Sequence, residues 1–104
     1  MTTPGTTRFD TDTALALVAP GLYRGSIDRG WWIINGPNGG YVAAIVLRAL
    51  LMEVNDVARA PRSLTLHYLR PPVEGPVDVA VVIERSGRTL TTATARLLQG
   101  GKLL

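Results

Sequence analysis

Cysteine is absent from the 104-residue sequence, and histidine occurs once, at His67. Without thiols there is no disulfide, no thiolate metal site and no cysteine nucleophile, and a single imidazole cannot build a metal-ligand cluster. No apolar run approaches the roughly 18 to 20 residues that a membrane-spanning helix needs. The amino terminus has neither the basic start nor the apolar core of a secretion signal. We therefore expect a cytoplasmic protein with no membrane span and no cofactor.

Charge is low and scattered. Eleven Lys and Arg against eight Asp and Glu give a net charge of +3, and the basic residues run from Arg8 to Lys102 without clustering. We therefore expect no nucleic-acid partner. A hydrophobic fraction of 46% with 18% charged residues is typical of a globular chain. This length supports one core, so we predict a flexible tail over residues 1–8 and a single domain over residues 9–104.

Hydrophobic periodicity predicts one helix and several strands. Residues 41–54 carry apolar side chains at helical spacing and around most of the surface, which predicts a central helix enclosed by the rest of the protein. Residues 13–18 fit either a strand or a short helix. Alternating apolar residues predict four strands, at residues 22–28, 63–70, 77–84 and 89–98.

Glycine and proline mark the turns between these elements. Residues 35–40, with one proline and three glycines, predict a loop without regular structure. Residues 85–88 predict a hairpin turn with Gly87 at positive φ. A second glycine turn, at residues 99–102, precedes only two residues, whereas a return strand needs about five to pair. We expect the last strand of the sheet to be missing, and the exposed edge of residues 89–98 to favour aggregation or dimerisation.

Three segments, taken in order, resemble the first hotdog of the acyl-CoA thioesterase II-like family: GPNGGYVAAIVLRAL, SLTLHYLRPP and ERSGRTLTTATARLLQGGK. The resemblance runs from about Phe9 to the end of the chain. It implies an α+β hotdog fold, an antiparallel sheet wrapped around a central helix. It also implies hydrolysis of fatty acyl-CoA in a tunnel between two hotdogs, and a homo-oligomer formed by sheet pairing. In double-hotdog members the catalytic Asp, Thr and Gln lie in the second hotdog, which these segments do not include.

Asn38, Gly39 and Gly40 stand where the predicted helix begins. The first N–H groups of a helix lack intrahelical partners, and its dipole favours negative charge there. Glycines leave the backbone open to close approach, so these amides suit a thioester carbonyl that gains charge. Spacing alone favours an N-cap at Asn38 followed by a tight turn. The resemblance favours the oxyanion role for the amides, and Asn38 is the one candidate for a catalytic side chain.

Aromatic residues flank this loop. Trp31, Trp32 and Tyr41 supply large apolar area, which suits the lining of an acyl tunnel, core packing or dimer contacts. We take Trp32 and Tyr41, with residues 38–40, as the predicted substrate-binding set. His67 fits a structural position better than that of a general base, because no carboxylate is spaced to orient it.

A catalytic carboxylate is not identified. Within the predicted helix the only carboxylate is Glu53, near the far end. The other carboxylates considered read as solvated charges without a catalytic role; these are Asp28, Asp56, Asp78 and Glu84. Three arginines suit either CoA phosphates or ordinary surface positions; these are Arg62, Arg70 and Arg88.

Three functions remain open at this point. The first is an acyl-CoA thioesterase. The second is a non-catalytic acyl-CoA-binding or dimerisation half of a double-hotdog protein, favoured by the missing carboxylate. The third, a hotdog dehydratase, is the weakest, because residues 36–41 carry no histidine.

Overall fold

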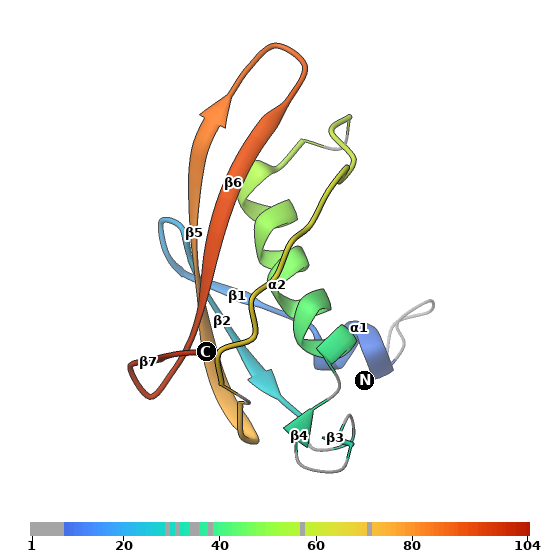
Figure 1. The fold of residues 1–104 in the computed structure, drawn as a ribbon, viewed down its shortest axis with the longest axis vertical. Coiled ribbons are helices and arrows are strands. Elements are labelled where there is room, and N and C mark those ends of the chain that lie inside the picture. The colour runs from blue at the N-terminus through green and yellow to red at the C-terminus, as the bar shows by residue number, and fades with distance from the viewer. Residues whose placement is uncertain are drawn as a thin grey trace.

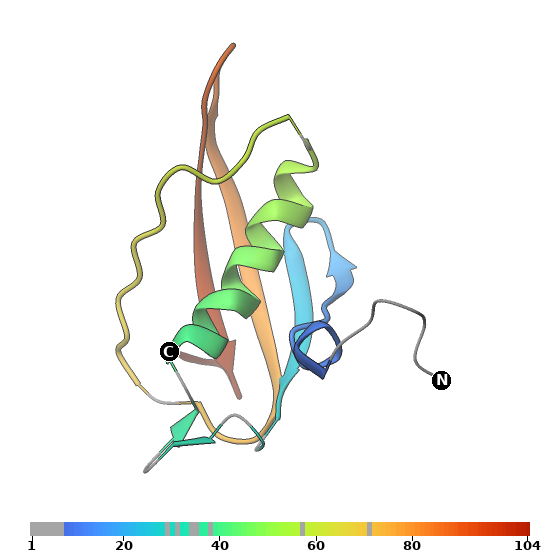
Figure 2. The same cartoon turned by 90° about the vertical axis from the view of Figure 1, so that its right-hand side faces the viewer.

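In the described residues a computed structural model shows an antiparallel sheet with one long helix laid across a face (Figures 1 and 2). The residues described are 8–28, 30, 32–33, 36–37, 39–56, 58–70 and 72–104. The helices and strands, in chain order, are α1 (Arg8–Asp12), β1 (Ala16–Ala19), β2 (Leu22–Ile27), β3 (Trp32–Ile33), β4 (Gly36–Pro37), α2 (Gly39–Val54), β5 (Gly75–Ser86), β6 (Thr91–Gln99) and β7 (Lys102–Leu103). The main sheet has the order β1-β2-β5-β6-β7.

The core lies between α2 and the sheet. The helix predicted at residues 41–54 is confirmed and begins two residues earlier. One stripe of α2 is buried, at Tyr41, Val42, Ile45, Val46 and Ala49. This stripe belongs to one cluster with the inward side chains of β5, Val77, Val79 and Val81. The buried residues of α2 recur every three or four positions, as one face of a helix requires, and those of β5 recur at every second position, as one face of a strand requires.

The expectation of an enclosed helix is wrong for its outer face. Leu51 and Met52, near the end of α2, are each 41% exposed. The sheet lies on one side of α2 only, as Figure 2 shows. An apolar composition all round a helix predicts burial, but only the face that meets the sheet is fully covered here.

The strands predicted at residues 22–28, 77–84 and 89–98 are confirmed as β2, β5 and β6. β2 pairs with β5 from Leu22↔Ala80 to Ile27↔Gly75. β5 and β6 form a long hairpin, and β5 runs on to Ser86. The turn therefore starts later than predicted: the Gly87 amide donates to the Leu90 carbonyl at 2.8 Å. Gly87 is not at positive φ, so that part of the turn prediction is wrong.

Residues 63–70, predicted as a strand, do not form one. They run as an irregular extended segment past α2 (Figure 1). Their contact with the end of the chain is made by Leu69 and Arg70, whose amides donate to the Leu104 carbonyl at 2.9 and 3.3 Å. A strand needs a ladder of hydrogen bonds with a neighbour, and alternating side chains alone do not provide one.

Two further predictions change near the amino terminus. Residues 13–18, predicted as a strand or a short helix, do not form a single element. Residues 13–15 connect α1, which ends at Asp12, to β1, which begins at Ala16. Residues 35–40 are partly regular: Ile33 of β3 pairs with Gly36 of β4, and α2 starts at Gly39. The predicted tail falls on residues 1–7, outside the described residues, and on Arg8, which begins α1.

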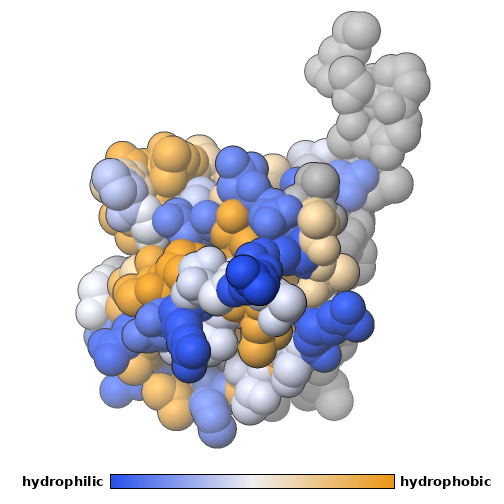
Figure 3. Space-filling model, turned by 90° about the horizontal axis from the view of Figure 1, so that it is seen from above, coloured by the Kyte–Doolittle hydropathy of each residue, from blue (hydrophilic) through white to orange (hydrophobic). Residues whose placement is uncertain are grey.

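The second glycine turn is confirmed. Gly100 and Gly101 have φ of 58° and 79°, conformations that glycine adopts without steric cost. β7 then pairs with β6 at Leu98↔Leu103 and Gln99↔Lys102. None of the described helices has both the length and the apolar character needed to cross a membrane. Seen from the end with the β5–β6 turn, apolar surface forms patches between charged side chains (Figure 3).

Candidate functional site

The first turn of α2, the predicted substrate site, lies against the ends of α1 and β2. Tyr41 makes these connections. Its hydroxyl lies 2.8 Å from the Asp12 carbonyl and 3.2 Å from the Ser26 carbonyl, and it accepts a hydrogen bond from the Asp28 amide at 3.0 Å. The residue is 2% exposed, and burial raises the pKa of its hydroxyl. Tyr41 therefore anchors the helix start to the domain.

Two carboxylates reach the same region and share one cation. Arg8 pairs with Asp12 at 3.1 Å and with Asp28 at 3.3 Å. The hydrogen bonds that the Arg8 guanidinium donates to these carboxylates raise the pKa of the guanidinium. The Asp28 carboxylate also accepts a hydrogen bond from the Gly30 amide at 2.6 Å. Asp28 has no role in the sequence-based prediction. The structure places its amide within hydrogen-bond distance of the Tyr41 hydroxyl, and its position as the last residue of the strand predicted at residues 22–28 was the available signal.

Tyr68 borders the beginning of α2 from the other side. Its hydroxyl donates to the Gly39 carbonyl at 2.8 Å, although the side chain is 59% exposed. A Cβ at Gly39 would lie 3.6 Å from the Tyr68 hydroxyl, an ordinary contact. The sequence pattern carries no signal of a site role for Tyr68, because only folding brings this residue beside Gly39, which lies 29 residues away in the chain.

The structure describes only some of the remaining predicted site residues. Gly39 and Gly40 lie in the first turn of α2 as expected. Trp32 belongs to β3, but nothing is described of its side chain, and Asn38 lies outside the described residues, as does Trp31. His67 is exposed in the extended segment.

The other carboxylates considered have partners on the surface. Asp78 pairs with Arg24 at 2.8 Å, and Asp56 pairs with Arg59 at 3.3 Å. Glu84 accepts a hydrogen bond from Thr94 at 2.7 Å. These contacts join neighbouring strands or close a helix end, which agrees with reading the carboxylates as surface charges.

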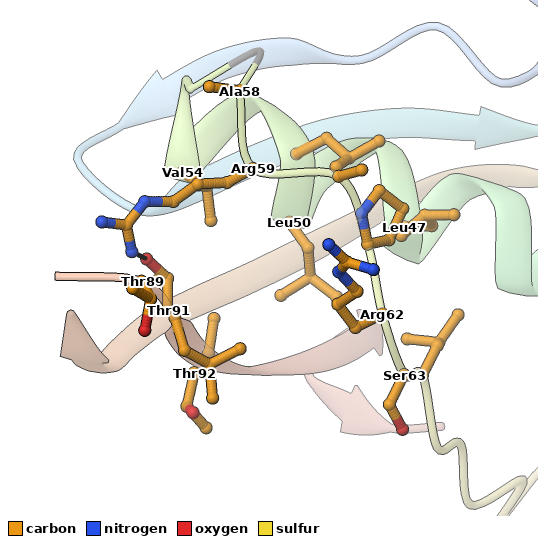
Figure 4. Close-up of a pocket in the computed structure, with 16 residues that line it drawn as sticks. Leu47, Leu50, Val54, Ala58, Arg59, Arg62, Ser63, Thr89, Thr91 and Thr92 are labelled. Carbon is orange, nitrogen blue, oxygen red and sulfur yellow. Dashed lines mark hydrogen bonds between the residues drawn. The ribbon is translucent and has the colours of Figure 1, made fainter. Parts of the chain in front are cut away.

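A cavity of about 400 Å³ lies at the opposite end of α2 (Figure 4). It is bounded by the second half of α2, by residues 58–64 and by residues 89–93. Arg59 spans its mouth: it donates to the Thr91 hydroxyl and the Gly87 carbonyl, both at 2.7 Å, and to the Arg88 carbonyl at 3.0 Å. Arg62 lines the cavity, while Arg70 lies by Leu104. These hydrogen bonds of Arg59 hold the connection that follows α2 against the β5–β6 turn.

An antiparallel sheet packed on one long helix, with glycines opening that helix, defines the class of hotdog domains of the thioesterase type. The chain belongs to the acyl-CoA thioesterase N-terminal domain family, whose model matches residues 28–104. It is 34% identical over 83 residues to the thioesterase-like protein TwmA of Talaromyces wortmannii. That match covers 78% of this chain and 24% of TwmA.

Two solved structures are similar. One is a protein assigned as a thioesterase II from Thermobifida fusca, with a TM-score of 0.79 and 30% identity over 96% of this chain. The other is a conserved hot dog protein from Alicyclobacillus acidocaldarius, with a TM-score of 0.76 over 95% of this chain. At 24% identity the second shows the fold alone. This chain spans 37% of each of those chains.

Proposed function

We propose that this domain acts in the hydrolysis of fatty acyl-CoA thioesters to free fatty acid and CoA, with the thioester carbonyl held at the first turn of α2. The supporting observation is that α2 of a chain in this family begins with Gly39 and Gly40. The positive end of the helix dipole stabilises a developing oxyanion. Glycine at both positions adds no Cβ that would hinder a close approach to the backbone.

In the proposed reaction water attacks the carbonyl carbon and the carbonyl oxygen becomes an oxyanion. The tetrahedral intermediate then collapses, the C–S bond breaks, and the CoA thiolate takes up a proton as the acid forms. Gly39 and Gly40 would bind the oxyanion, and Trp32 would border the acyl chain. Tyr41, predicted from the sequence to bind substrate, is buried and would instead hold the start of α2 in place. Asn38 is the candidate for positioning the water. The sequence and the described contacts assign no general base.

A non-catalytic acyl-CoA-binding or dimerisation half is the second candidate. It is supported by Asp12 and Asp28, the carboxylates that the structure brings near the start of α2. Both carboxylates are engaged in ion pairs with Arg8.

The first test is release of CoA thiol from a series of acyl-CoAs, with acyl-CoA binding measured in parallel. Gly39→Ala is the informative variant, because its methyl group would meet Tyr68 only at ordinary contact distance. We expect the fold to be retained and turnover to fall about 10-fold or more, as for a weakened oxyanion site. Gly87→Ala is the matched control, since its Cβ would lie 3.4 Å from the Leu90 carbonyl at the β5–β6 turn.

Three results distinguish the candidates. Turnover that falls in Gly39→Ala and Asn38→Ala but not in Gly87→Ala supports the thioesterase. Saturable binding of acyl-CoA without turnover supports the non-catalytic half. A folded chain that neither binds nor hydrolyses acyl-CoA contradicts the thioesterase and the acyl-CoA-binding half, and leaves the dimerisation half.

A further inference from the structure

The short helix α1 depends on its contacts with α2. It has five residues, and an isolated helix of fewer than about 12 residues is marginal in water. Arg48 of α2 donates to the Asp10 carbonyl at 3.0 Å and to the Thr13 hydroxyl at 2.7 Å, and Thr13 is fully buried. Tyr41, seven residues before Arg48 and so on the same face of α2, lies 2.8 Å from the Asp12 carbonyl. The position of α1 is therefore tied to the first half of α2.

Four residues, which we call the Arg8 ring, close a circuit of contacts between α1, the end of β2 and the start of α2. The Arg8 guanidinium pairs with Asp12 through Nε at 3.1 Å and with Asp28 through Nη2 at 3.3 Å. The Tyr41 hydroxyl lies 2.8 Å from the Asp12 carbonyl and accepts a hydrogen bond from the Asp28 amide at 3.0 Å. Each member of the ring therefore contacts two others, so that the loss of one contact loosens its neighbours.

Gly30 makes room for the Arg8 ring. Its amide donates to the Asp28 carboxylate at 2.6 Å, which extends the ring toward the loop before α2. A Cβ added at Gly30 would lie 1.4 Å from Nη2 of Arg8, whereas non-bonded heavy atoms pack at about 3.5–4.0 Å. The Arg8 guanidinium thus occupies the place of a side chain at position 30, and any larger residue there has to displace it.

Arg8 holds covered groups from the solvent side. Its side chain is 64% exposed, whereas that of Asp12 is 12% exposed. A carboxylate largely removed from water is costly unless a cation pairs with it, and Arg8 provides that cation. Its two partners are bound through separate nitrogens of one planar group, which a lysine ammonium cannot reproduce. Removal of the Arg8 side chain therefore opens the ring without taking a side chain out of the core.

We infer that Arg8 is a positioning residue for the first turn of α2, which it holds through the Arg8 ring. The inference rests on the proposed function, in which Gly39 and Gly40 of this turn receive the thioester carbonyl. A misplacement of about 1 Å can cost on the order of 100-fold in rate, so a residue that fixes this turn affects turnover without touching the reacting atoms. Because the amides act on charge that develops in the transition state, loosening them lowers kcat more than it raises KM.

The first test compares Arg8→Ala with Arg24→Ala. Arg24 is the matched control, because it is an exposed arginine of β2 that pairs with a carboxylate, Asp78, at 2.8 Å on the outer face of the sheet. Neither substitution removes a core side chain, so both proteins should fold. We expect Arg8→Ala to lower kcat for acyl-CoA hydrolysis about 10-fold while KM changes less than about 3-fold. Arg24→Ala should leave both constants unchanged.

A second variant, Gly30→Ala, displaces the guanidinium and leaves every charge of the ring in place. We expect kcat to fall as in Arg8→Ala. In the double variant Gly30→Ala should cost little more, because the guanidinium it collides with is gone and the other close atom, a carboxylate oxygen of Asp28 at 2.9 Å, ends a side chain that can move. Residues that act through one network are not additive, so additive losses would overturn the inference.

Amide exchange measures the ring without any substrate. The amides of Asp28 and Gly30 donate into the ring, and we expect both to exchange at least about 5-fold faster in Arg8→Ala and at an unchanged rate in Arg24→Ala. If the unmodified chain shows no turnover, the proposed function fails, whereas exchange still decides whether Arg8 holds the ring. Unchanged exchange in Arg8→Ala would overturn the inference, as would faster exchange with an unchanged kcat in an active chain.

Discussion

Two buried tyrosines carry polar contacts between the helix and the sheet. Tyr23 of β2, 4% exposed, donates its hydroxyl proton to Glu53 at 2.7 Å. Tyr41 binds the backbone at the other end of α2. Burial, followed by the hydrogen bond to Glu53, raises the pKa of Tyr23 to about 12. Ionisation of this phenol would place two negative charges side by side.

The raised pKa of Tyr23 predicts loss of stability at high pH. An unfolded tyrosine ionises near pH 10, so the unfolded chain releases this proton before the folded chain does. The stabilising contribution is complete below about pH 10 and is lost as the pH rises toward about 12. We expect Tyr23→Phe to show a shallower fall in the free energy of unfolding over this range, measured by urea denaturation at several pH values. Parallel curves for the two proteins would contradict the assignment; Tyr68→Phe is the exposed control.

Among the elements, α2 shows most clearly how burial divides one apolar sequence. Ile45 is 1% exposed and packs in the core, whereas Met52 on the same helix is 41% exposed. Both are large apolar residues with similar side-chain volume. The difference between them is contact with the sheet.

This division predicts different costs for the same truncation. Ile45→Ala leaves a cavity in the core and should lower the free energy of unfolding by about 2–5 kcal/mol. Met52→Ala removes a partly exposed side chain and should change it by about 0.5 kcal/mol or less. Thermal or urea unfolding of the two variants measures this directly. Equal destabilisation would show that the outer face of α2 is covered in solution.

The sequence predicted some elements better than others, for physical reasons. The helix and three strands were predictable because each buries one face in the core between helix and sheet, and this burial sets the spacing of its apolar residues. Residues 63–70 have the same alternation but form no strand, because backbone pairing depends on a neighbour that periodicity does not specify. The positive φ predicted for Gly87 was wrong because β5 extends to Ser86, which moves the turn further along the chain.

At the scale of the whole molecule, the sheet has two edges. β7 lies at one and β1 at the other. All four residues of β1 are exposed, with Leu17 at 62% and Val18 at 45%. Exposed apolar edge strands favour pairing with another chain.

We predict that the chain self-associates by sheet pairing through β1. Leu17→Lys should shift the population toward monomer, because an edge lysine opposes strand pairing. Leu90→Lys is the matched control: Leu90 is 59% exposed and lies in the β5–β6 turn. Sedimentation velocity distinguishes the species. A stable, folded monomer for the unmodified chain would contradict the prediction.

The candidate site was only partly predictable from the sequence. The glycines at the start of α2 were identified because their spacing before an apolar helix is visible along the chain. Tyr68 contacts Gly39 from 29 residues away, and Arg8 meets Asp28 across 20. Contacts of this kind depend on how the elements are folded together, so local spacing carries no signal for them.

The sequence by itself determined the family, the long helix, the confirmed strands and the glycines at positions 39, 100 and 101, because periodicity and backbone freedom are local properties. The tertiary structure alone decided which face of α2 is covered, which carboxylates share Arg8, and that Leu104 lies between Leu97 and Leu69. These depend on segments distant in the chain being brought within hydrogen-bond range. That proximity results from packing the helix on the sheet.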